Sequence, residues 1–152
     1  MADDFFSYGA TPAPAGPAEA PMPRLLGELG DVDWERLIAF TARRRYPHGA
    51  EVVRAGQDQR ALYFVVAGRV RVELPGQPPD SRGEGEVIGL LSFLDGAPSA
   101  ARAVADGEAE LLMLTRDSLQ QLGAWQPRIA MALLRDLAAH AAARLRRLQP
   151  GD

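Results

Sequence analysis

The chain has 152 residues, 47% of them hydrophobic and 24% charged, which is the composition of a soluble globular protein with one domain. It contains no Cys, no Lys and no Asn, and all 17 basic residues are Arg. This composition excludes disulfides, thiolate nucleophiles, Schiff-base lysines and Asn-linked glycosylation. No stretch approaches the roughly 18 apolar residues of a membrane helix, so no membrane span is expected.

The net charge of -3 comes from the first 23 residues. These carry Asp3, Asp4 and Glu19 and no basic residue, whereas 17 Arg balance 17 acidic residues from Arg24 onward. Affinity for phosphate backbones depends chiefly on excess positive charge, so we expect no DNA partner. The segment also lacks the basic and apolar regions of a signal peptide, and we expect a cytoplasmic protein.

Residues 1–23 are rich in Pro, Ala and Gly, and they hold too few large apolar side chains to offset the entropy lost on ordering. We predict a disordered tail. Within it, Phe5, Phe6 and Tyr8 follow two acidic residues, and exposed aromatic side chains of this kind are suited to docking in a groove of a protein partner. The alternative is that this cluster folds back onto the domain.

The periodicity of residues 24–41 is helical and predicts short lead-in helices. Between residues 42 and 115 the apolar residues form short runs separated by glycines, which is typical of an antiparallel sandwich or barrel. Gly68 separates the apolar run 62–66 from the alternating Val70, Val72 and Leu74. This pattern predicts a hairpin at Gly68.

Helical periodicity returns in residues 116–148 and predicts a short and a long C-terminal helix. The short helix spans residues 117–122 and ends at Gly123, and the long one begins at Pro127 and runs to about residue 148. One face of the long helix must be covered by the barrel or by a second copy of the chain; it comprises Leu134, Leu137, Ala141, Leu145 and Leu148. We therefore predict one domain over residues 24–152.

Three stretches of this chain are similar to a known family: YPHGAEVVRAGQDQRALYFVVAGRVRVEL (46–74), GEVIGLLSFLDGAPSAARAVA (85–105), and LLMLTRDSLQQL (111–122) with the terminal helix. They resemble the cyclic nucleotide-binding domain family, which includes the catabolite activator, regulatory subunits of protein kinase A and gated channels. The resemblance covers residues 33–148. It implies a mainly β fold, an antiparallel jelly-roll β-barrel with flanking helices, in which Gly49, Gly56 and Gly68 lie at turns.

The family binds its ligand through a phosphate-binding cassette that reads Gly-Glu-Leu-Ala-Leu and, further on, Pro-Arg-Ala-Ala-Thr. The resemblance implies that backbone N–H groups and the arginine hold the cyclic phosphate, while the glutamate binds a ribose hydroxyl. Here Leu90 stands at the glutamate position and Ser99 at the arginine position. A residual site in this altered cassette would comprise Gly89, Leu90, Leu91, Ser92, Ser99 and Ala100.

These two replacements weaken the predicted site. Losing the arginine contact costs about 1.5–3 kcal/mol and losing the carboxylate contact costs a similar amount, which together weaken binding roughly 10²- to 10⁴-fold. Arg102 lies three positions beyond Ser99 on the following strand, so we expect it to point to the opposite face, outward. We predict that cAMP and cGMP do not bind at physiological levels and that no cofactor is needed.

The sequence lacks the residues that a metal site or nucleophilic catalysis requires. A metal site of the kind found in jelly-roll cupins needs several His and a Glu, but this chain has only His48, in a turn, and His140, on the terminal helix. Without Cys, and without a Ser paired to a His, nucleophilic catalysis also lacks its parts, so we expect a non-enzyme. We interpret Arg144, Arg146 and Arg147 as solvated cations at a helix C-terminus.

Two functions remain open. In the first, the domain is a regulatory module that docks to a protein partner through its tail or barrel surface, and it can form a homodimer through the C-terminal helix. A DNA-binding module of the catabolite-activator type would continue beyond that helix, and none is expected. In the second, the altered cassette takes a cyclic nucleotide or another small molecule, and the domain is a sensor. We favour the first, because an apolar residue has replaced a polar one that contacts the ligand.

Overall fold

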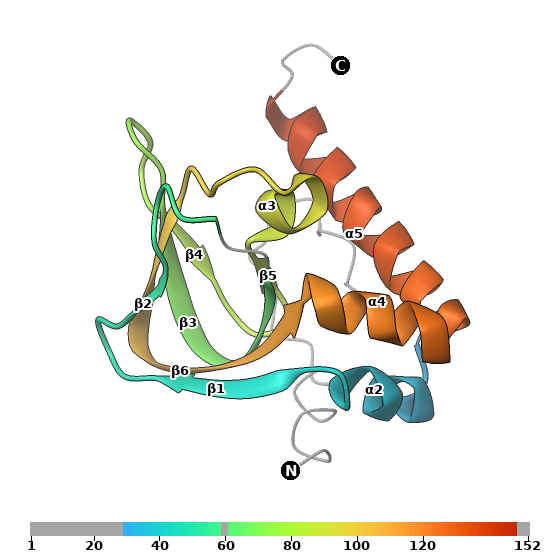
Figure 1. Cartoon of the computed structure of the whole chain (residues 1–152). Helices are drawn as coiled ribbons and strands as arrows, with labels where there is room; N and C mark the ends of the chain where they lie inside the picture. Colours follow the sequence, from blue (N-terminus) through green and yellow to red (C-terminus); the bar gives the residue numbers. More distant parts are fainter. Residues whose placement is uncertain (1–28, 59–60, 149–152) are drawn as a thin grey trace, which may run out of the picture.

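A computed structural model describes residues 29–58 and 61–148 of the chain. The helices lie along one side of the strands, and α3 sits between the strands and α5 (Figure 1). In chain order the elements are α2 (Asp31–Ile38), β1 (Ala42–Tyr46), β2 (Glu51–Val53), β3 (Ala61–Glu73), β4 (Asp80–Arg82), β5 (Val87–Ile88), α3 (Leu90–Asp95), β6 (Arg102–Thr115), α4 (Arg116–Trp125) and α5 (Pro127–Leu148).

The strands form a six-stranded antiparallel sheet in the order β1-β6-β3-β4, with β2 also paired to β6 and β5 to β3. The long strands β3 and β6 pair from Ala61 opposite Thr115 to Glu73 opposite Arg102. The predicted mainly β, jelly-roll-like fold with flanking helices is confirmed. The predicted barrel is not closed, since within the described residues the ladder runs from β1 to β4 and these two edge strands do not pair.

The hairpin predicted at Gly68 is wrong, because β3 runs through this residue as one strand of 13 residues. Its register against β6 shifts between Val65 and Ala67 and again between Ala67 and Arg69. Gly68 has a φ of +83°, and a Cβ there would overlap the carbonyl oxygen of Glu108 on β6. The glycine therefore marks a bulge where two strands bend together, which looks like a turn in the sequence.

The helix boundaries differ from the predicted ones at two points. In the described part of the predicted lead-in region, α2 covers Asp31–Ile38. Gly123 does not end the short C-terminal helix, because α4 continues to Trp125 and is separated from Pro127, the first residue of α5, by Gln126 alone. At the start of α4 the side chain of Thr115 accepts a hydrogen bond from the Ser118 amide at 3.0 Å, which is the N-cap that the helix needs.

Two clusters of buried side chains hold the fold together, and β3 contributes alternate residues to both. The helix-side core comprises Leu37, Leu62, Phe64, Val66, Val87, Leu90, Phe93, Leu112, Leu114, Leu122, Ile129, Ala130, Leu133 and Leu137. The strand-side core comprises Val52, Val53, Ala61, Tyr63, Val65, Val70, Ile88, Ala103, Ala105, Ala109 and Leu111. Because both faces of β3 are covered, its sequence shows an unbroken apolar run rather than an alternating one.

The apolar face predicted on the last helix is divided in the structure. Leu137 is fully buried in the helix-side core, whereas Leu134 and Leu145 are exposed, as is Met131 one turn before Leu134. Ala141 packs partly buried against the same core. The side chain of Leu148 lies outside the described set, and so does the whole tail with the predicted docking residues Phe5, Phe6 and Tyr8. None of the described helices is long and apolar enough to cross a membrane.

Candidate functional site

The segment that resembles the cassette forms a tight turn into a short helix. Gly89 precedes α3 with a φ of +84°, a left-handed conformation that glycine adopts without strain, and a Cβ there would lie 2.9 Å from the Ala61 carbonyl oxygen. The helix α3 has only six residues and ends at Gly96, which is also left-handed. The backbone therefore has the compact strand-turn-helix shape that the resemblance implies.

The two positions that differ from the family pattern are both engaged inside the protein. Leu90 is 1% exposed and belongs to the helix-side core. The Ser99 hydroxyl donates to the Ala101 carbonyl at 2.9 Å and accepts from the Ala101 amide at 3.2 Å. The Leu90 side chain is thus part of the core, and the Ser99 hydroxyl makes its hydrogen bonds within its own loop.

The end of the cassette is also tied to the loop after β2. The Gly56 amide donates to the Ser99 carbonyl at 2.8 Å, and the Ser99 amide donates to the Gln57 carbonyl at 3.3 Å. Gly56 has a φ of +83°, so this turn also depends on a glycine. These two bonds hold the loop against the strands.

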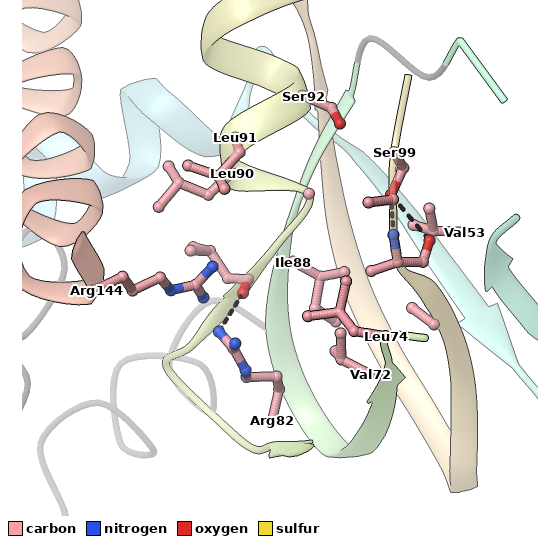
Figure 2. Close-up of a pocket in the computed structure, with 15 residues that line it drawn as sticks. Val53, Val72, Leu74, Arg82, Ile88, Leu90, Leu91, Ser92, Ser99 and Arg144 are labelled. Atoms are coloured by element: carbon pink, nitrogen blue, oxygen red, sulfur yellow. Dashed lines mark hydrogen bonds between the residues drawn. The ribbon is translucent and has the colours of Figure 1, made fainter. Parts of the chain in front are cut away.

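A cavity of about 150 Å³ lies beside the cassette (Figure 2). All six predicted site residues line it, together with residues of the strands and of α5: Val53, Val72, Leu74, Arg82, Val87, Ile88, Gly89, Leu90, Leu91, Ser92, Ser99, Ala100, Ala101, Ala103 and Arg144. The structure therefore brings the predicted residues to one place. The volume is below the roughly 300–1,000 Å³ typical of small-molecule sites.

Two arginines of this cavity were not predicted as site residues. Arg82 is the last residue of β4, and Arg144 lies on α5, 62 positions further along the chain; Figure 2 shows the two side chains pointing toward one another. Arg82 pairs with Asp80 at 3.0 Å and donates to the Val87 carbonyl at 3.5 Å. The interpretation of Arg144 as a solvated cation is wrong, because it is half-buried at the cavity, whereas Arg146 and Arg147 are exposed.

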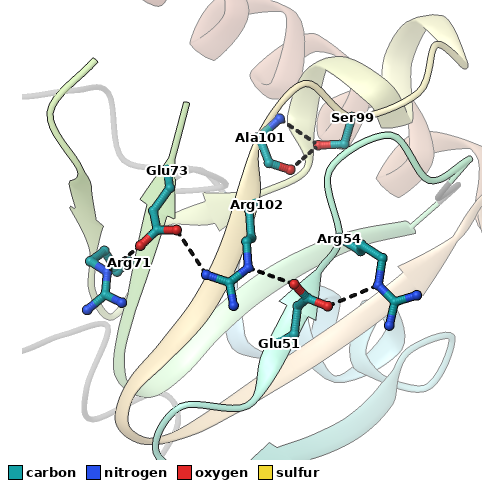
Figure 3. Close-up of polar contacts among 7 residues, drawn as sticks. All are labelled: Glu51, Arg54, Arg71, Glu73, Ser99, Ala101 and Arg102. Carbon is teal, nitrogen blue, oxygen red and sulfur yellow. Dashed lines mark hydrogen bonds and ion pairs between the residues drawn. The ribbon is translucent and has the colours of Figure 1, made fainter. Parts of the chain in front are cut away.

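Arg102 points outward, as predicted, and joins two strands across the rim of the sheet (Figure 3). Its guanidinium contacts Glu51 at 2.7 Å and Glu73 at 3.0 Å, and Arg54 and Arg71 pair with the same two carboxylates. Hydrogen bonds from Arg102 and then Arg54 lower the pKa of Glu51, and those from Arg71 and then Arg102 lower the pKa of Glu73. The side chain of Arg102 therefore forms ion pairs on the sheet and does not line the cavity.

The two histidines lie in different environments. His48 accepts a hydrogen bond from the Gly107 amide at 2.8 Å through Nδ1, which links two turns. His140 is buried, and its Nδ1 has no hydrogen-bond partner among the described residues. Burial lowers the pKa of His140, although the carboxylates of Asp136 and Glu86 act in the opposite direction. The described residues contain no cluster of three or more side chains suited to hold a metal ion.

The fold and the cavity define a class of protein: a jelly-roll-like sheet with a short helix in the cassette position and a long terminal helix beside it. The sequence profile of the "Cyclic nucleotide-binding domain" matches residues 43–124. The chain belongs to this family.

Known proteins agree with this assignment. The chain is 37% identical over 114 residues to the "Cyclic AMP receptor protein" of Thermus thermophilus, covering 72% of this chain and 51% of the receptor. It is 31% identical over 106 residues to a cyclic nucleotide-gated potassium channel of Rhizobium etli, covering 70% of this chain and 30% of the channel. The crystal structure of the Thermus thermophilus catabolite activator protein superimposes with a TM-score of 0.73 at 32% identity, covering 82% of this chain and 59% of that one. The chain thus spans about half of the receptor and less than a third of the channel.

Proposed function

We propose that this chain is a non-enzymatic regulatory module that does not take cAMP or cGMP and acts through contacts with another protein. The observation that supports this proposal is the state of the two altered positions. Leu90 is packed in the helix-side core, and the hydroxyl of Ser99 is already bonded to Ala101. Leu90 has no polar atom to offer a ribose hydroxyl, and Ser99 cannot turn its hydroxyl to a phosphate without breaking the bonds to Ala101.

Cavity size supports the same proposal. At about 150 Å³ the cavity offers less room than small-molecule sites usually provide. A nucleotide that enters it has to displace side chains of the lining, and it lacks the charge-assisted bonds that an arginine and a glutamate at the two altered cassette positions would supply. We expect affinity for cyclic monophosphates to be roughly 10²- to 10⁴-fold below that of a site with both polar residues.

Isothermal titration of the full chain with cAMP and with cGMP tests the proposal. We expect no saturable heat for the wild type and measurable cAMP binding for Ser99→Arg, which restores the missing cation. Adding Leu90→Glu to Ser99→Arg places a carboxylate in the core, so circular dichroism must first establish that the double variant folds. Binding of cAMP or cGMP to the wild type with a Kd of about 1 μM would contradict the proposal.

The exposed face of α5 is the contact surface that we propose for a second copy of the chain. Met131, Leu134 and Leu145 are 67%, 39% and 57% exposed, and with Ala138 between them they follow the 3.5-residue spacing of a helix pair. Light scattering coupled to size exclusion measures the assembly. We expect a dimer for the wild type and a monomer for Leu134→Glu with Leu145→Glu, while Leu91→Glu, which changes an exposed leucine on α3, leaves the dimer intact.

The tail is the second proposed contact surface, for a different protein. Deletion of residues 1–23 should abolish co-purification of a partner from cell extract without changing the melting temperature of the domain. Substituting Phe5, Phe6 and Tyr8 together with Ser is the sharper version of this test, because it keeps the length and charge of the tail. Unchanged co-purification by both variants would remove the docking role.

A second candidate function is a sensor for a ligand other than a cyclic monophosphate. The observation in its favour is the presence of Arg82 and Arg144 in the cavity lining. The cassette has lost its arginine, but two other elements bring cations to the same cavity.

A further inference from the structure

We propose that the cavity beside the cassette binds a compact organic oxyanion, with an apolar body against the cassette wall and a single carboxylate or phosphate group between Arg82 and Arg144. This inference rests on the second candidate function, and it assigns the ligand class. The anion position differs from that of the cassette arginine, because neither Arg82 nor Arg144 belongs to the cassette and they come from β4 and α5.

The charge of the lining supports an anion. The described residues that line the cavity include two arginines and no aspartate or glutamate. The carboxylate that pairs with Arg82, Asp80, is 65% exposed and lies outside the lining. No salt bridge joins Arg144 to a carboxylate of the described residues, so two cations approach one small space with little compensation inside it. An oxyanion between them relieves this repulsion and accepts the fork geometry of each guanidinium.

Arg82 is held ready for such a group. The side chain of Arg82 is only 15% exposed, and its contacts with Asp80 and the Val87 carbonyl fix its direction. Arg144 extends from α5 toward Arg82 (Figure 2). A cation that is positioned before binding loses less rotational entropy when the ligand arrives, which favours affinity.

The rest of the lining sets the shape and polarity of the ligand body. It is mainly aliphatic, with Val72, Leu74, Ile88 and Ala103 among its members. The Ser99 hydroxyl is satisfied within its own loop, so it does not select for a polar body. A volume of about 150 Å³ suits a body of one ring or a short branched chain and is too small for a nucleoside unless side chains of the lining move.

Binding of this kind would connect the sheet to the terminal helix. Arg82 is at the end of β4, and Arg144 is on the last turns of α5, so one anion bonded to both holds these elements together. We expect slower amide hydrogen exchange in residues 140–148 when the site is filled. A ligand held by the cassette alone would not produce this protection.

Isothermal titration of the full chain with phenyl phosphate and with benzoate tests the proposal, with phenol and inorganic phosphate as probes of the body and the anion alone. We expect saturable binding of at least one aryl anion with a Kd of about 1 mM or tighter, and much weaker binding of phenol and of inorganic phosphate. The two aryl anions distinguish a phosphate from a carboxylate site. Hydrogen exchange with the tighter one should show the protection of α5.

Variants identify the cations. Arg82→Gln and Arg144→Gln should each weaken binding about 10- to 100-fold, whereas Arg135→Gln, which removes an exposed arginine from the same helix, should leave it unchanged. Absence of saturable binding by both aryl anions, or equal loss in all three variants, would overturn the proposal. Binding of cAMP by the wild type would instead contradict the proposed function, so the two failures are distinguishable.

Discussion

The helix-side and strand-side cores stabilise the same sheet in different ways. The helix-side core is built mainly from Leu and Phe, which fill the space under α2, α4 and α5, whereas the strand-side core is built mainly from Val and Ala. Large side chains of the first core interlock, and the second relies on close approach of backbones at positions such as Gly68. The cavity lies where the two meet, with Leu90 from one and Ala103 from the other. The small side chains of the strand-side core therefore leave space for the cavity, whereas the large side chains of the helix-side core fill the space around them.

The strongest test of this comparison is Leu90→Ala. Leu90 is fully buried in the helix-side core, so its truncation should lower the free energy of unfolding by about 2–5 kcal/mol, measured by urea denaturation. Leu91→Ala is the matched control, because Leu91 is the next residue of α3 and is 57% exposed, and it should change stability by less than about 0.5 kcal/mol. Equal losses in the two variants would mean that Leu90 is not part of the interlocked core.

Gly68→Ala tests the strand side. The left-handed backbone and the overlap of a Cβ with the Glu108 carbonyl should together cost about 2–3 kcal/mol of unfolding free energy. Gly76 also has a positive φ, of +72°, but its Cβ would meet nothing within 4 Å, so Gly76→Ala should cost only about 1 kcal/mol. If the two variants lost the same unfolding free energy, β3 and β6 would be shown to move apart at Gly68 without an energetic penalty.

Mild acid should weaken the helix side first, because of His140. Burial lowers the pKa of its imidazole in the folded state, so the unfolded chain takes up a proton at a higher pH than the folded one. Stability should therefore fall as the pH drops below the unfolded value of about 6.5, and His140→Leu should flatten this slope. Denaturation curves at about pH 7 and about pH 5.5 measure it. A variant that keeps the wild-type slope would assign the acid sensitivity elsewhere.

The rim of the strand side should respond only at lower pH and by the smallest amount. The pKa values of Glu51 and Glu73 are lowered by their arginine partners, so this contribution is present above about pH 4.3 and is lost as the pH falls through the lowered values. Arg102→Gln should reduce stability slightly at neutral pH, less at low pH, and less again in high salt. Melting temperatures at two salt concentrations measure the effect. A decrease in melting temperature that is the same at both concentrations would contradict an electrostatic origin.

The sequence predicted the parts of the site that lie in one segment. The residues from Gly89 to Ala100 are neighbours along the chain, so a local motif was sufficient to group them, and all six predicted residues line the cavity. Arg82 and Arg144 could not be found in this way. They line one cavity only because the fold brings the end of β4 close to α5. In addition, an arginine near a helix end is more often a solvated cation.

The errors at two glycines have a related cause. A glycine with a positive φ can serve a turn or a bulge, and only the close approach of β6 distinguishes the two at Gly68. Gly123 could have ended α4, but the helix continues past it for two residues before Gln126 and Pro127 end it. In both cases the residue type permits a break in the chain, and the packing of distant elements decides whether the break occurs.

The reciprocal bonds between Ser99 and Ala101 have a consequence for signalling. Because the Ser99 hydroxyl is already bonded within its own loop, we expect a ligand in the cavity to change the shape of this loop little. For the ligand proposed above, occupancy would then be transmitted through α5, which supplies Arg144 to the lining and is not part of the strand ladder.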